Sequence, residues 1–321
     1  MIARRAFPFI LATAAIAFAA PAFAQAYPSR PIHFIMPFPP GPADVTIRLY
    51  GQKLSEDWKQ PAIVETRTGA TGTVGTELAV KAPPDGYTLL FTVDLPITMA
   101  PNLLKVPYDP QRDLIPIAAV VESSNVLVVN SASGLRSLAD LVAMAKAKPG
   151  VLTFSSAGIG SPAHLCGAMI EKQAGIDMIH VPYSGAGPAM NALVAGDVTM
   201  FCSPIQQALP FIKAGKLVPL GVAATAESPL LPGVPPLSKT YPGLVLSQWF
   251  GLLAPKGTPA AITNALQVEF KRISDEPEIQ SKLKAIGLQP HWLDGTELAQ
   301  RIVSDTAKIR DFMTAAHIHA E

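Results

Sequence analysis

Short apolar runs alternate with amphipathic stretches along most of the chain. The first run, PIHFIMPF (31–38), is typical of a buried strand, and a proline-rich turn and apolar residues at helical spacing (44–58) follow it. The same order of strand, turn and helix recurs from PAIVETR, YTLLFTV, NVLVVN, LTFSSAG and DMIHVPYSG. This alternation predicts an α/β fold with mostly parallel sheets that are flanked by helices on both faces.

The C-terminal part has a different pattern. A proline-rich run leads into a second apolar strand candidate at the end of 228–255, and helical stretches with apolar stripes follow in 258–287 and 297–316. No further strand is evident there, so these helices are expected to close off a core. The strand candidate would carry the chain back from one lobe to the other, and the length of the chain also favours two lobes.

The first residues predict a signal peptide. Arg4 and Arg5 precede an apolar stretch (7–20), and small residues then lead to a cleavage site near Ala24. The apolar stretch is too short to span a bilayer. We therefore expect a signal in 1–24 and a periplasmic protein, exported by the general or the twin-arginine route.

The composition narrows the class of partner. With 49% hydrophobic and 15% charged residues, the chain can bury a large core, which excludes disorder. The net charge of +1 gives no global attraction to nucleic acid or to acidic membranes, so a partner must be recognised locally.

The two cysteines, Cys166 and Cys202, lie 36 positions apart. An oxidising compartment permits them to pair, whereas cysteine is also a common small core residue. The sequence favours two buried free thiols and leaves the disulfide open, because the Cα separation that decides the matter is not in the sequence.

Three turns combine glycine with proline or small hydroxyl residues between a strand and a helix: PFPPGPAD (37–44), RTGATGTVG (67–75) and SSAGIGSPAH (155–164). Unpaired N–H groups at a helix start favour an anion such as a carboxylate or a phosphate. The alternative is that they are ordinary helix caps, with Asp44 and Ser161 as N-cap side chains. Two such turns at one cleft favour an anion site, because open α/β sheets bind ligands beyond the carboxyl ends of their strands.

Motifs of catalytic and cofactor sites are missing. The chain has no G-x-x-x-x-G-K-[ST], G-x-S-x-G, H-E-x-x-H or CxxC. We predict a protein with no catalytic activity, no metal site and no cofactor. His164 either lines a pocket or packs as a neutral core histidine.

Six segments together resemble one protein family, and they agree with it in order and spacing. They are YPSRPIHFIMPFPPGPADVTIRLYGQKL, VETRTGATGTVGTELAVKAPPDGYTLLF, VPYDPQRDLIPIAAV, LTFSSAGIGSPAHL, HVPYSGAGPAMNALVAGDV and WFGLLAPKGTPAAI. From Tyr27 to the C-terminus the chain resembles the Bug, or TctC-like, periplasmic receptors of tripartite tricarboxylate transport systems.

The resemblance implies the two-lobed fold of type II periplasmic binding proteins, with a cleft between the lobes. Lobe 1 would comprise 27–124 plus 249–321 and lobe 2 would comprise 125–248. A small organic acid would bind in the cleft, and closure would report it to a membrane partner, either transporter subunits or a sensor kinase ectodomain. A receptor that must close freely is expected to be a monomer. The alternatives are an exported sensor accessory protein and an exported enzyme on the same fold.

The resemblance, the turns themselves and the departures from the family pattern together give the candidate ligand-binding residues. The candidates are Pro40, Gly41, Ala43, Asp44, Asp94, Ser156, Ala157, Gly158, Gly160, Ser161, His164, Tyr183, Ser184 and Cys202.

The chain departs from the family pattern at three places. The first loop is one residue shorter, and Pro42 has no N–H to donate. Asp94 stands where a serine is common, and Cys202 where an aspartate or asparagine is common. A carboxylate from Asp94 in the cleft would repel a second anionic group and favour an amine or hydroxyl on the ligand, unless Asp94 lies at the surface and caps the following turn.

Overall fold

The computed structural model describes residues 27–159 and 161–315. The expected signal in 1–24 and the site candidate Gly160 lie outside these residues. Within the described ranges, no helix combines the length and the apolar character that crossing a membrane requires.

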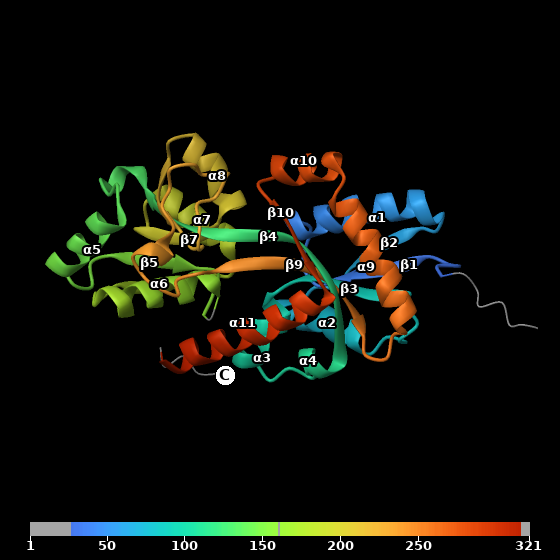
Figure 1. Ribbon diagram of the computed structural model, residues 1–321. Helices are drawn as coiled ribbons and strands as arrows, with labels where there is room; N and C mark the ends of the chain where they lie inside the picture. Colours follow the sequence, from blue (N-terminus) through green and yellow to red (C-terminus); the bar gives the residue numbers. More distant parts are fainter. Residues whose placement is uncertain (1–26, 160, 316–321) are drawn as a thin grey trace, which may run out of the picture.

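The structure has two lobes, each with its own group of parallel strands and its own core, and a shared strand joins both groups into one ten-stranded sheet (Figure 1). In lobe 1, β1 (Ile32–Met36) pairs in parallel with β2 (Ala62–Thr66) and β3 (Thr88–Val93). In lobe 2, β5 (Thr153–Ser156) pairs in parallel with β6 (Ile179–Pro182) and β7 (Met200–Pro204). Five of these six strands come from the apolar runs of the sequence, whereas β7 was not predicted.

Two long strands, β4 (Leu114–Asn130) and β9 (Ser247–Pro255), connect the lobes (Figure 1). They pair antiparallel from the Leu114–Pro255 pair to the Ser124–Ser247 pair. From Asn125 onward, β4 pairs with β7 and with β8 (Leu217–Val222) instead. The strand arrangement is therefore mixed: β1 to β3 and β5 to β7 pair in parallel within each lobe, as expected, whereas β4, β8 and β9 pair antiparallel with their neighbours.

Helices cover the sheets. Their bounds are α1 Pro42–Trp58, α2 Thr73–Val80, α3 Ala100–Leu103, α4 Pro110–Asp113, α5 Leu138–Ala147, α6 Pro162–Ala174, α7 Ala186–Ala195, α8 Ile205–Lys213, α9 Ala260–Ser274, α10 Pro277–Ala285 and α11 Gly295–Ala315. Shorter helical turns are η1 Ala70–Gly72, η2 Leu95–Met99, η3 Ser131–Ser133 and η4 Leu237–Lys239.

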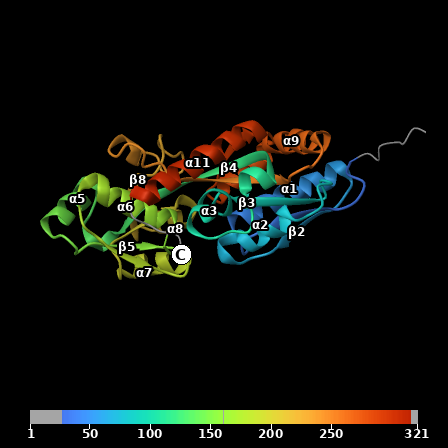
Figure 2. The same cartoon turned by 90° about the horizontal axis from the view of Figure 1, so that it is seen from below.

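The C-terminal region contains one strand that the sequence did not reveal. This strand, β10 (Gln289–Asp294), pairs antiparallel with β4. The last helix, α11, then runs across the lobes toward lobe 2 (Figures 1 and 2). There Met313 packs with Met99 of lobe 1 and Leu165 of lobe 2, so the helix contacts both sides of the cleft.

The expectation of two free thiols was wrong, because Cys166 and Cys202 form a disulfide. It joins α6 to β7, and the two Cα atoms are 6.2 Å apart, within the usual range for a disulfide. The helix packs directly over the strand, and sequence separation alone could not show this.

Candidate functional site

A cavity of about 1010 Å³ lies between the lobes and is lined by residues of both. Its walls include the segments that follow β1, β3, β5 and β6, which are the carboxyl ends of the parallel strands. Ligands of open α/β sheets bind at these ends, because the helix starts gather there.

The first loop contributes Pro40, Gly41 and Ala43 to the lining. Gly41 is the N-cap of α1 and Pro42 occupies the first turn. Asp44 is not an N-cap, which corrects that alternative: it is 5% exposed and accepts hydrogen bonds from Arg48 Nε at 2.8 Å and Nη2 at 3.0 Å. Asp44 lies outside the residues that line the cavity.

The loop from β5 to α6 contributes Ala157 and Ser161 to the lining. Ser161 is the N-cap of α6, and its Oγ accepts the backbone N–H of His164 at 3.4 Å. Ser156 and Gly158 lie behind the lining and shape the loop: the Gly158 N–H donates to Ser156 Oγ at 3.1 Å. Gly158 has φ +127°, a region that favours glycine.

His164 lies outside the lining and packs against a second histidine. Its ring stacks on His180 with the centroids 4.0 Å apart, and the His180 ring stacks on Phe154. Burial lowers the pKa of His164, and burial together with the neighbouring His164 lowers the pKa of His180 to about 4. Both rings are therefore neutral at neutral pH and support the loop from behind, with Ser156 Oγ 2.7 Å from His180 Nε2.

The loop from β6 to α7 places a third helix start at the cavity. Ser184 lines it together with 185–187, and Gly185 caps α7 without a side-chain hydrogen bond. Tyr183 packs against the core of lobe 2 and lies outside the lining. Of the turn in 67–75, Thr71 reaches the cavity.

The floor of the cavity is made of residues that sequence reasoning missed. Asn125 of β4, Gln206 of α8 and Gln248 of β9 line it beside the predicted Cys202. A signal was available, because the polar residues ESSN interrupt the otherwise apolar run of β4 where the strand passes between the lobes.

Asp94 lies on the far side of the cavity wall. Its neighbours Val93 and Leu95 line the cavity, whereas Asp94 is 8% exposed and interacts with Asp305 and Arg301 of α11. Burial, reinforced by the charge of Asp305, raises the pKa of Asp94 to about 8. The alternative of a surface residue that caps the next turn is therefore wrong, since Asp94 is buried and makes no side-chain cap.

The cavity is uncharged. Among the lining residues that the structure describes there is no Asp, Glu, Lys, Arg or His. An anion in this cleft would therefore be held by backbone N–H groups and neutral side chains.

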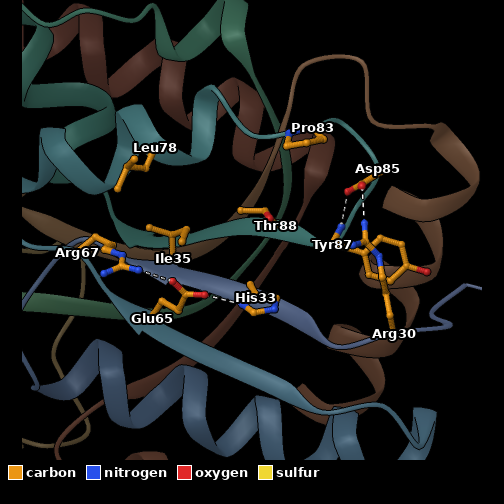
Figure 3. A pocket seen from close by; sticks show the side chains of 10 residues that line it. All are labelled: Arg30, His33, Ile35, Glu65, Arg67, Leu78, Pro83, Asp85, Tyr87 and Thr88. Carbon is orange, nitrogen blue, oxygen red and sulfur yellow. Dashed lines mark hydrogen bonds and ion pairs between the residues drawn. The ribbon is translucent and has the colours of Figure 1, made fainter.

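A second cavity of about 410 Å³ lies on the sheet of lobe 1 (Figure 3). Its polar side chains pair with one another: Glu65 contacts His33 and Arg67, and Asp85 contacts Arg30.

Comparison with known proteins identifies the family. Residues 46–317 match the model of TctC, the tripartite tricarboxylate transporter family receptor. The protein BugT of Bordetella pertussis is 36% identical over 87% of this chain and 86% of its own length.

Solved structures of other proteins also match this chain over most of its length. A structure from R. palustris with adipate has a TM-score of 0.81 and 26% identity, covering 92% of this chain and 100% of that one. MatC from Rhodopseudomonas palustris with bound malate has a TM-score of 0.75 and 28% identity, covering 89% and 99%.

Proposed function

This chain belongs to the TctC family of tripartite tricarboxylate transporter receptors, and we propose that it is a periplasmic receptor that captures a small organic carboxylate between its lobes. The adipate and malate in the two related structures support a carboxylate ligand. The family and its structural neighbours are solute-binding proteins, which supports binding without catalysis.

The observation that carries the proposal is the group of helix starts at one uncharged cavity. α1 begins on the lobe 1 side, and α6 and α7 begin on the lobe 2 side. The N–H groups of a first helical turn have no partner within the helix, and the helix dipole adds positive potential there. A carboxylate between these turns would bind both lobes and favour closure.

We further propose that 27–124 plus 249–321 move against 125–248 about the crossing strands β4 and β9. The closed form would then be recognised by the membrane subunits of a tripartite transporter. The change of partner strand at Asn125 supports a hinge at this place.

Thermal unfolding of the purified protein with mono-, di- and tricarboxylates tests the proposal. A true ligand at 100 times its dissociation constant stabilises the folded state by about 2.7 kcal/mol, and its neutral amide analogue should not. A panel in which no carboxylate raises the midpoint would refute the proposal.

A charge placed in the cleft gives a second test. Ala157→Asp adds a negative side chain to the lining and should weaken carboxylate binding more than tenfold. Ala132→Asp adds the same charge at an exposed turn outside the lining and should leave binding unchanged. Equal affinities for the two variants would contradict the assigned site.

A further inference from the structure

The start of α7 is the least occupied of the three helix starts. Residues 184–187 all line the cavity, and no side chain caps the helix. A proline removes one N–H from the first turn of each of the three helices, so the helices differ in what else occupies that turn. In addition, the carboxylate of Asp44 lies in the first turn of α1, and Ser161 of α6 already accepts the N–H of His164. The α7 start is therefore the natural position for one carboxylate.

Asn125, at the floor of the cavity, favours a ligand group other than a carboxylate. Its side chain is 1% exposed, it lines the cavity, and its Oδ1 has no hydrogen-bond partner among the described residues. A buried amide oxygen without a partner is unfavourable, so a ligand group that donates a hydrogen to it would be stabilised. A carboxylate offers acceptor oxygens alone and cannot satisfy Oδ1, whereas a hydroxyl can donate its hydrogen to it.

The surroundings of Asn125 are also neutral. Gln206 and Gln248 line the floor, and Gln206 Oε1 accepts the hydroxyl of Ser123 at 2.6 Å. No charged side chain stands among the described lining residues to offset the desolvation of a second anionic group.

Most of the remaining side chains that line the cavity are apolar. They include Phe38, Leu95, Met99, Leu103, Phe201 and Phe250. An apolar ligand body would bury its surface against them.

We infer that the ligand is a monocarboxylate with an apolar body and an uncharged donor, such as a hydroxyl, at the end away from the carboxylate. The carboxylate binds at the start of α7 and the donor binds Asn125. This inference rests on the proposed function and narrows its substrate class.

Two matched sets of probes test the inference by titration calorimetry on the purified protein. The first set is hexanoate, 6-hydroxyhexanoate and adipate, and the second is benzoate, 4-hydroxybenzoate and terephthalate. In at least one set, the hydroxy acid should bind ten times more tightly than both the plain acid and the diacid.

Three outcomes would overturn the inference. A diacid that binds most tightly shows that the floor accepts a second carboxylate, and this leaves the proposed function intact. Equal affinities for the plain and hydroxy acids would show that Asn125 does not recognise the hydroxyl group. Failure of all six probes also overturns the inference, whereas the proposed function fails when the wider carboxylate panel gives no binding.

Asn125→Leu, in which the new side chain is close in size, tests whether Asn125 is the residue that binds the hydroxyl group. It should abolish the tenfold preference for the hydroxy acid over the plain acid. Asn264→Leu, at an exposed position of α9, is the matched control and should keep the preference. A preference that survives in Asn125→Leu would contradict the assignment, and the comparison of probes on the unaltered protein stands even where a variant folds poorly.

Discussion

The buried carboxyl of Asp94 predicts an unusual dependence of stability on pH. Its pKa in the folded protein is about 8, against an ordinary value of 3.8, because burial and the neighbouring Asp305 disfavour the charged form. Between these two values the folded protein keeps a proton that the unfolded chain releases. The contribution of Asp94 to stability is therefore greatest below pH 3.8 and falls as the pH rises toward 8.

The magnitude follows from the shift. Each pH unit between the two pKa values costs about 1.4 kcal/mol, so at pH 7 the Asp94 carboxyl destabilises the folded state by about 4 kcal/mol. Asp94→Asn cannot ionise and removes this cost. The free energy of unfolding of the variant, relative to the unaltered protein, should therefore rise by about 1.4 kcal/mol per unit between pH 5 and pH 7.

Urea unfolding at pH 5, 6, 7 and 8 measures this difference. Asp197→Asn, the same change at an exposed aspartate, controls for the loss of one negative charge. A difference between Asp94→Asn and the unaltered protein that stays constant from pH 5 to pH 8 would refute the claim that Asp94 is protonated in the folded state.

Three further predictions concern lobe 2. Replacing Cys166 and Cys202 by serine opens a 36-residue loop and should lower the free energy of unfolding by about 4 kcal/mol, measured by urea unfolding; an unchanged value would count against the disulfide. Gly167→Ala would place a methyl group within 2.3 Å of the ring of Phe154 and should cost about 1–3 kcal/mol, and an unchanged melting temperature would contradict this packing. Ser161→Ala removes the N-cap of α6 and should cost about 1 kcal/mol by the same assay, with Ser161→Gly costing less.

The sequence predicted most of the strands and helices, because their signals are local. The six apolar runs and their turns became β1 to β3, the end of β4, β5 and β6, each followed by a helical segment, whereas β7 and β8 were not predicted. It did not predict β10, whose residues 289–294 are at most half-buried and carry no continuous apolar run. Their strand form depends on pairing with β4, which a local pattern does not contain.

The candidate site was predicted as a set of loops, and only some of the predicted residues line the cavity. Pro40, Gly41 and Ser184 lie at the cavity because loops at strand ends face it. Asp44 does not line the cavity, because its carboxylate pairs with Arg48, one helical turn later. Asn125 was missed because it belongs to a strand that the sequence assigns to the core.

By itself the sequence determined the order of most strands and helices and the glycine and proline turns at their ends. These depend on local periodicity and backbone chemistry, which nearby residues specify. Only the tertiary structure decided the disulfide, the burial of Asp94 beside α11, and the neutral floor around Asn125. Each of these depends on segments far apart in the chain that meet across the crossing strands, and side-chain direction and burial are properties of that packing.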